Sequence, residues 1–354
     1  MDLVHGSFYV GGHYEDIPDF GTGRVGQMYV EFQLENPTQP YPMVFVHGGG
    51  SNGSTWITCP DGRRGWAPFF VEHGFGAYMV DWPGVGRSFH QEAFYGPAQN
   101  RASVEDAEKR LTDIAQHRLW PQAKLHSQWP GTGRAGDPVF DNMMDARGSS
   151  GPADVALTQA LTRDALSALL DRIGPAIIVT HSASGHIGWA IGDKRPEAVK
   201  ALIQLEPSGP PVHDVTSIGE DAPYAESASA ARPWGLTAVP LAYDPPVNDP
   251  TELHFVRASG QPTPERALGW LQAEPARRLV NLSRVPILML TAEASYHAVY
   301  DHATSEYLDQ AGVDHTYIRL EEIGIHGNGH KLNTELNNLE IAETVRRWIG
   351  DAVK

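Results

Sequence analysis

The chain has 354 residues, of which 41% are hydrophobic and 20% are charged, a balance typical of a globular protein with a substantial core. Its formal net charge of -16 argues against nucleic-acid binding, because phosphate contacts need clustered Lys and Arg. No stretch approaches the roughly 18 uninterrupted apolar residues of a membrane span. We therefore expect neither a nucleic-acid partner nor a membrane partner.

Apolar runs alternate with helical patterns along the chain, which indicates an α/β protein whose mostly parallel sheet has helices on both faces. The first two expected strands, 6–10 and 27–34, look antiparallel. Further strands are expected at 42–46, 76–80, 177–181, 201–205, 286–291 and 315–320. One expected helix ends at 69–73, and others cover 157–173, 184–191 and 336–349. The last of these carries Leu339, Ala342, Val345 and Ile349 on one face.

Two long segments, 89–150 and 207–284, do not fit this alternation. We interpret them as insertions into a single domain, the first after the fourth strand and the second a cap between the sixth and seventh strands. Both would lie over the carboxyl edge of the sheet, where open α/β sheets bind ligands, or else be surface embellishments remote from the site. Their aromatic residues would wall an apolar pocket or, equally, form a private core of these segments. These aromatic residues are Trp120, Trp129, Phe140 and Trp234.

The stretch from Ile177 to Gly185 indicates a nucleophile. Ser182 follows a β-branched strand and precedes small residues, so a sharp turn would expose its hydroxyl above the sheet. The usual pattern, G-x-S-x-G, has glycine at both outer positions. Here Thr180 and Ser184 stand there, and the glycine is displaced to Gly185. For this segment alone, a strand followed by an ordinary Ser-rich turn is the alternative.

A second motif, His47-Gly48-Gly49-Gly50, follows an apolar strand directly. Glycines let backbone N–H groups point into a cavity without an intervening side chain. An HGGG sequence at this place matches the oxyanion loop of lipase-like and esterase-like enzymes. The expected donors are the N–H groups of Gly49 and Ala183, with Gly48 as a weaker candidate. A phosphate loop is disfavoured because no Gly-Lys-Ser/Thr follows.

A serine also needs a base that takes its proton. His330 comes after the last expected strand, is preceded by Gly329 and is followed by Glu335 at the head of the final helix. This arrangement resembles one in which a loop histidine reaches back over the nucleophile, so we assign His330 as the base. His326 is the alternative.

The third companion is an acid that orients the histidine. Glu206 stands at a buried strand end and is pinned by Pro207, which suits a residue that must hold an imidazole tautomer. Where an aspartate would ordinarily lie, after the next-to-last strand, this sequence has Ser295, and Glu293 nearby is the alternative acid. The order Ser182, Glu206, His330 runs nucleophile, acid, base.

Together the HGGG motif, the segment Asp81–Ser88, the serine turn and the Gly329-His330 pair resemble the α/β-hydrolase superfamily over about residues 43–353. The Asp81 segment looks like the D-x-P-G-x-G-x-S turn, which shapes the sheet edge and is not itself catalytic. A closer similarity is to a small group of microbial esterases whose acid is a glutamate after the sixth strand. Serine at position 182 argues against dehalogenases and epoxide hydrolases, whose nucleophile is aspartate.

The resemblance implies a serine hydrolase that cleaves a small-molecule carboxylic ester, or a lactone, through an acyl-enzyme on Ser182. No metal and no organic cofactor is expected. The same triad serves amide hydrolysis, carbon–carbon bond hydrolysis and perhydrolysis, which stay open. From a different class, a catalytically silent α/β-hydrolase fold used as a binding protein is the alternative.

Two features suggest the location of the protein. The single cysteine, Cys59, permits no intramolecular disulfide, which fits a reducing compartment, although many secreted enzymes also lack disulfides. Residues 1–7 have neither the basic nor the apolar region of a secretory signal. We expect a cytoplasmic protein unless a leader was trimmed from the chain. The oligomeric state stays open because no heptad repeat or interface stripe is present.

Overall fold

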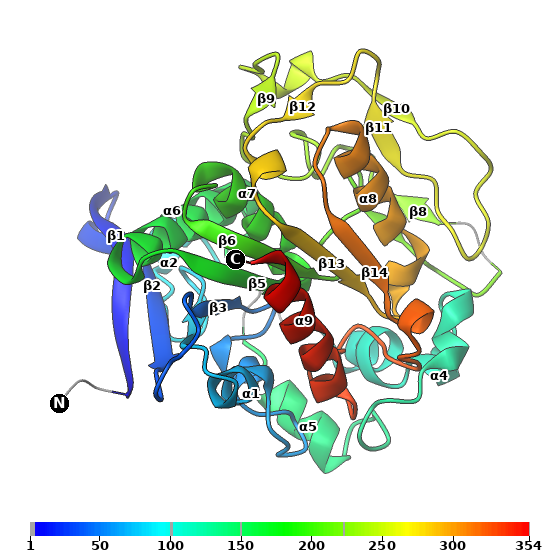
Figure 1. Ribbon diagram of the computed structural model, residues 1–354, viewed down its shortest axis with the longest axis horizontal. Helices are drawn as coiled ribbons and strands as arrows, with labels where there is room; N and C mark the ends of the chain where they lie inside the picture. Colours follow the sequence, from blue (N-terminus) through cyan, green and yellow to red (C-terminus); the bar gives the residue numbers. More distant parts are fainter. Residues whose placement is uncertain (1–3, 100–101, 149–150, 222–223, 354) are drawn as a thin grey trace.

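The central sheet has eight strands in the order β1-β2-β4-β3-β5-β6-β13-β14 (Figure 1). The computed structural model describes residues 4–99, 102–148, 151–221 and 224–353. β1 pairs antiparallel with β2 and β2 antiparallel with β4, and the remaining neighbours are parallel, which confirms the expected mostly parallel sheet. The strands are β1 (His5–Ile17), β2 (Gly21–Gln33), β3 (Met43–Val46), β4 (Ala77–Asp81), β5 (Ala176–His181), β6 (Val199–Leu205), β13 (Ile287–Thr291) and β14 (Thr316–Arg319).

Helices cover both faces of this sheet. α6 (Val155–Ile173), α7 (Gly185–Lys194) and α8 (Asp301–Gln310) share one apolar core, and α1 (Trp66–Glu72) and α9 (Asn338–Ala352) share the other. Successive strand side chains point to opposite faces, so Val44 of β3 faces the first core and Phe45 the second. Burial on both faces explains why these strands read as continuous apolar runs.

Two helices differ from expectation. α8 is absent from the sequence-based assignment because its buried face includes Asp301, His302 and Thr304, which interrupt the apolar pattern. α9 begins at Asn338, so Glu335 lies in the turn before it and not at its head. On its buried face, Ile341 joins Ala342, Val345 and Ile349, whereas Leu339 is only partly buried.

The segment 89–150, apart from residues outside the described ranges, contains several short helices joined by loops. Ile114, Trp120 and Ala123 pack against Ala294 and Tyr300, which follow β13, so this part lies over the carboxyl end of the sheet. Figure 1 shows α4 near the ends of β13 and β14. The helices are α2 (Glu92–Tyr95), α3 (Val104–Ala107), η2 (Glu108–Thr112), α4 (Ile114–His117), η3 (Pro121–Leu125) and α5 (Pro138–Asp145).

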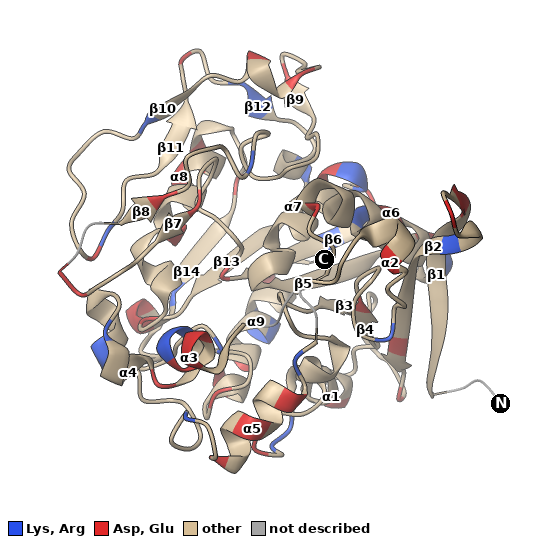
Figure 2. Ribbon diagram, turned by 180° about the vertical axis from the view of Figure 1, so that it is seen from behind, with Lys and Arg blue, Asp and Glu red and all other residues tan. Residues whose placement is uncertain are grey.

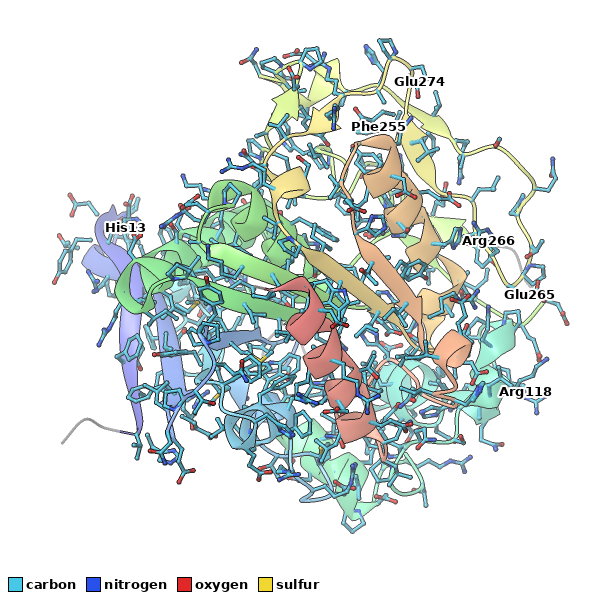
Figure 3. All side chains as sticks on the ribbon, viewed as in Figure 1. His13, Arg118, Phe255, Glu265, Arg266 and Glu274 are labelled. Atoms are coloured by element: carbon cyan, nitrogen blue, oxygen red, sulfur yellow. The ribbon has the colours of Figure 1, made fainter. Side chains whose placement is uncertain are left out.

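The segment 207–284 contains three two-stranded sheets, β7–β8, β9–β12 and β10–β11. Much of it packs beside α7 and α8 and not over the strand ends: the hydroxyls of Tyr243 and Tyr307 lie 2.8 Å apart. Figure 3 labels Glu265 on its outer loop, where the Glu265 carbonyl accepts a 3.0 Å hydrogen bond from Gln122 of the first segment. The strands are β7 (Val215–Thr216), β8 (Ala225–Glu226), β9 (Tyr243–Asp244), β10 (Phe255–Arg257), β11 (Trp270–Gln272) and β12 (Arg278–Leu279).

The negative charge is distributed over the molecule. Figure 2 shows Asp and Glu on many elements, among them α5, α8 and the turn between β1 and β2. Within the described ranges, no helix combines the length and the apolar character needed to cross a membrane. The remaining short helical turns are η1 (Gly53–Trp56), η4 (Ser182–Ser184), η5 (Pro250–Glu252), η6 (Leu282–Arg284), η7 (Tyr296–Val299) and η8 (Leu320–Ile323).

Candidate active site

Ser182 lies at the tip of the turn between β5 and α7. Its φ is 57°, in the left-handed region that residues other than glycine rarely occupy. Such a conformation costs on the order of 1–3 kcal/mol and persists only where the surroundings impose it. The buried strand before Ser182 and the helix after it impose the turn here, which resembles the strained strand–turn–helix of a nucleophile elbow.

Thr180 and Ser184, the residues at the outer motif positions, are both buried and hydrogen-bonded. The Thr180 hydroxyl donates to the side chain of Gln204. Ser184 Oγ accepts from the His181 N–H at 2.8 Å and lies 3.0 Å from the Val46 carbonyl, to which it donates. Both side chains therefore stabilise the turn, and neither position requires glycine.

The close backbone approach occurs one residue later, at Gly185. A Cβ added to Gly185 would lie 2.5 Å from Pro207 Cα, so no larger residue fits there without movement of the backbone. The displaced glycine of the motif thus has a packing reason. Pro207 directly follows Glu206, so this contact also fixes the chain beside that carboxylate.

His330 lies between Ser182 and Glu206. Its Nε2 is 2.8 Å from Ser182 Oγ, and its Nδ1 is 2.5 Å from Glu206 Oε2. A proton on Nδ1 that is donated to the carboxylate leaves Nε2 to accept from the hydroxyl, the tautomer that a base needs. The structure therefore brings together the three side chains that the sequence selected.

Glu206 is fully buried at the end of β6 and has φ of 47°. Its Oε1 accepts from the Ala292 N–H at 2.8 Å, and its Oε2 accepts from Ser295 Oγ at 2.8 Å. Burial and the nearby charge of Asp301 raise the pKa of Glu206, and the hydrogen bonds from Ala292 and Ser295 oppose that shift. These bonds hold the carboxylate in one orientation toward His330.

The pKa of His330 is lowered well below its usual 6.5. Burial is the main cause, and the charges of His181, His297 and Lys331 act in the same direction. The imidazole is consequently neutral near neutral pH and available as a proton acceptor.

The two alternative residues, His326 and Glu293, contact each other. His326 Nδ1 lies 3.1 Å from Glu293 Oε1, and Glu293 Oε2 accepts from the Gly327 N–H at 2.8 Å. The side chain of His326 is 62% exposed, whereas Glu293 points at this loop and not at His330. Among the described contacts, neither residue hydrogen-bonds to Ser182.

Glu335 holds the loop that carries His330. It is fully buried, accepts from the Gly329 N–H at 3.0 Å and from Asn328 Nδ2 at 2.9 Å, and lies 2.9 Å from His126 Nε2. Glu335, five residues after His330, thus links the loop that carries His330 (the base loop) to the turn before α9 by hydrogen bonds. His126 brings the segment 89–150 to the same carboxylate.

Sequence reasoning missed a second ring beside the base. The His297 ring stacks on the His330 ring at a centroid distance of 4.8 Å and an angle of 5°. His297 Nδ1 lies 2.8 Å from Asp301 Oδ1, and Thr291 donates to the other oxygen at 2.6 Å. The only sequence signal is the four-residue spacing of His297 and Asp301, which is common in helices. His181, the last residue of β5, also contacts the base residue: its Nε2 lies 2.8 Å from the His330 carbonyl oxygen.

A cavity of about 180 Å³ opens beside Ser182 and is lined by Gly48, Gly49 and Tyr296. A Cβ on Gly48 would lie 3.1 Å from Ser182 Cβ, and one on Gly49 would lie 3.3 Å from Ala183 Cβ, so the glycine loop runs next to the serine. A larger cavity of about 530 Å³ lies within the second segment, among residues such as Tyr224 and Leu268, and has no lining residue in common with the first.

The four aromatic pocket candidates do not line the cavity beside Ser182. Trp120 is fully buried and its Nε1 donates to the Ala294 carbonyl at 2.9 Å. Trp129 and Phe140 pack together within the first segment, and Trp234 belongs to the core beside α7 and α8. All four are buried, because neighbouring residues cover most or all of their apolar surface, and composition alone does not reveal this.

Within the described residues, one group of side chains has the spacing for a metal ion. The ligand atoms of Glu206, His297 and His330 lie within 4.8 Å of one another. Each already has a hydrogen-bond partner: Glu206 and His330 bind each other, and His297 binds Asp301. We assign these atoms to the hydrogen-bond network.

This chain is similar to several known proteins, although no protein-family model matches it. A protein of Fungal sp. (strain ATCC 74256) named probable secreted lipase phiG is 44% identical over 347 residues, which is 97% of this chain and 88% of the relative. A solved structure described as that of a novel bacterial esterase covers 99% of this chain and 96% of its own, at 21% identity and a TM-score of 0.60. At this low sequence identity, the similarity to the esterase structure shows a shared fold and no more.

The expected cytoplasmic location is wrong. The fungal relative, which matches almost the whole chain, is named a secreted protein. The single cysteine does not distinguish a cytoplasmic from a secreted protein, because many secreted enzymes also lack disulfides.

Proposed function

Because the chain belongs to the α/β-hydrolase superfamily and to the family of that fungal probable lipase, we propose that it is a secreted carboxylic ester hydrolase that works through an acyl-enzyme on Ser182. The observation that carries this proposal is the continuous contact from Ser182 Oγ through His330 to Glu206, with distances of 2.8 and 2.5 Å. The name of the relative and this geometry point to the same chemistry.

In the first half of the reaction, Ser182 Oγ attacks the ester carbonyl while its proton passes to His330 Nε2. Glu206 accepts from Nδ1 and stabilises the imidazolium that forms. His330 then gives the proton to the leaving alcohol, and the acyl group stays on Ser182. In the second half, His330 takes a proton from water, the resulting hydroxide attacks the acyl carbonyl, and the carboxylic acid leaves as Ser182 regains its proton.

The tetrahedral oxyanion needs donors that are already oriented. We assign the N–H groups of Gly49 and Ala183, with Gly48 as a weaker candidate. The position of Gly48 and Gly49 at the wall of the cavity supports this assignment. Within the described residues, the Gly49 N–H donates to no backbone or side-chain acceptor, so it is available for a substrate oxygen.

We further propose that the segment 89–150 is an insertion that acts as a lid over the site. Its residues Arg110 and Leu111 line the cavity beside Ser182, which supports this role. The segment 207–284 contributes no lining residue among those described, so we assign it as a second insertion that supports the first and not as the cavity wall.

The test is the Ser182→Ala variant with 4-nitrophenyl butyrate, together with labelling by a fluorophosphonate probe. We expect kcat/KM to fall on the order of 10⁴-fold and labelling to disappear. Ser283→Ala, which changes an exposed serine in the second segment, is the control and should keep the wild-type kcat/KM and the fluorophosphonate labelling. Full turnover in Ser182→Ala would contradict the proposal, and wild-type protein that neither labels nor cleaves esters would favour the non-catalytic alternative. Turnover of an amide, of a substrate with a hydrolysable carbon–carbon bond, and of an ester in the presence of hydrogen peroxide, measured alongside the ester, tests the three other reactions.

A further inference from the structure

The cavity beside Ser182 has a charge opposite to that of the protein. The chain carries a formal net charge of -16, with acidic residues on many elements (Figure 2). Yet the charged groups that line this cavity are Arg110, Arg147 and Lys331 against the single carboxylate of Asp106. A positive wall in an acidic protein requires a local explanation.

Lys331 is the most informative of these residues. It directly follows His330, is only 8% exposed and lines the cavity together with Ser182. Among the described residues, no carboxylate lies within 4.0 Å of its ammonium group, although the charge of Glu335 acts on it from farther away. Glu335 itself already bonds Gly329, Asn328 and His126.

Burying an ammonium group without a partner is costly, because it loses hydration and gains no compensating charge. That cost lowers the pKa of Lys331 to about 8, with burial as the main cause and Arg147 as a second one. An opposite charge on a bound molecule would offset this cost, because complementary charges across an interface attract each other. The ligand is then the missing partner.

Arg110 lines the same cavity. It comes from η2 of the first inserted segment, whereas Lys331 comes from the base loop. One of its guanidinium nitrogens lies 3.4 Å from the Ser217 carbonyl, and the residue is partly exposed. Two cationic side chains from separate elements thus face one small cavity.

We propose that this cavity binds a carboxylate group of the substrate, so that the preferred ester carries a negative charge on its acyl half or on its alcohol half. The inference rests on the proposed function, since it concerns the substrate of the same site. A charge-assisted hydrogen bond from Lys331 to this carboxylate is about twice as strong as a neutral one, and the low dielectric of the cavity strengthens it further.

The experiment compares matched esters that differ only in one charged group. Monomethyl adipate and methyl hexanoate test the acyl half, and 5-acetoxypentanoate and pentyl acetate test the alcohol half. In each pair a terminal carboxylate replaces a methyl group. Wild-type kcat/KM is measured for all four by chromatography of the products, and the ratio of anionic to neutral ester within a pair is the readout.

We expect a ratio of about ten or more for one pair, and the pair that shows it identifies which half carries the charge. Lys331→Met should lower that ratio about tenfold or more, and Lys331→Arg should restore part of it. Lys124→Met is the matched control: this lysine is in the segment 89–150 that also carries Arg110, its side chain is 54% exposed, and it lies 3.7 Å from Glu220. Its ratio should equal that of the wild type.

A ratio of one or less in both pairs would overturn the proposal without any variant. An unchanged ratio in a folded Lys331→Met protein would also overturn it, and would leave Lys331 as a residue that acts on His330 alone. If none of the four esters is cleaved and Ser182 is not labelled by the fluorophosphonate, the proposed function itself fails. If the neutral esters are cleaved and only the preference is missing, the function stands and the carboxylate subsite fails.

Discussion

Ser295 Oγ and Glu206 Oε2 are 2.8 Å apart, and the same carboxylate oxygen lies 2.5 Å from His330 Nδ1. Glu206 ends β6 and Ser295 follows β13, two neighbouring parallel strands, so both residues reach the same edge of the sheet. The serine occupies the place at which the resemblance leads one to expect an aspartate. Its hydroxyl supports the acid from the neighbouring strand.

Because the two side chains are so close, we predict that a carboxylate at position 295, after β13, can take over the role of Glu206 at the end of β6. Glu206→Ala should lose most activity, and adding Ser295→Asp should recover about tenfold or more of the kcat/KM for 4-nitrophenyl butyrate, because the new carboxylate would start beside the place that the Glu206 carboxylate has left. Ser295→Asp alone should be less active than the wild type, since two buried carboxylates in contact repel each other. A folded double variant no more active than Glu206→Ala would contradict this prediction.

A second prediction separates the two candidate acids. Glu206→Gln keeps the shape of the side chain but cannot stabilise the imidazolium, so kcat/KM should fall by about 10³- to 10⁴-fold. Glu293→Gln is the matched control and should stay within about twofold of the wild type, because Glu293 contacts His326 and Gly327. The opposite pattern would transfer the role of acid to Glu293.

The pH profile follows from the lowered pKa of His330. The base must be neutral to accept a proton, so kcat/KM for a neutral ester should stay on its plateau as the pH falls through 6.5 and decline only below it. Lys331→Met removes a positive charge near the imidazole, which makes protonation easier and should move the acid limb to higher pH. A wild-type acid limb at or above pH 6.5 would contradict the lowered pKa of His330. A shift of the limb to lower pH in Lys331→Met would contradict the expected effect of the Lys331 charge on that pKa.

Gly185→Ala tests the packing reason for the displaced glycine. Its Cβ would lie 2.5 Å from Pro207 Cα, so we expect a loss of about 1–3 kcal/mol in the free energy of unfolding and a parallel loss of activity. Gly350→Ala on α9 is the control. A Cβ there meets nothing within 4 Å, and Ala in a helix should raise the stability by about 0.4–1 kcal/mol. Chemical denaturation of both variants gives the comparison.

The elements that the sequence predicted well are those whose signal is local. The runs that became β3 and β5 are apolar throughout because both faces of these strands are buried. α8 lacked such a signal, since its buried residues include Asp301 and His302, whose partners come from other elements: Asp301 bonds Thr291, and His302 bonds the Ala267 carbonyl. A side chain that becomes buried by long-range hydrogen bonding does not look apolar in the sequence.

For the candidate site, the sequence by itself determined the residue types after the strands: Ser182 and Glu206 directly follow β5 and β6, and His330 lies in the loop after β14. The tertiary structure decided which of two histidines and two carboxylates meet, because Glu335 fixes the direction of the base loop and Ser295 fixes that of Glu206. It alone also revealed the buried charge of Lys331 at the cavity. The positions of the strands along the chain follow from local patterns, whereas the direction of a loop side chain depends on contacts between residues far apart in the chain.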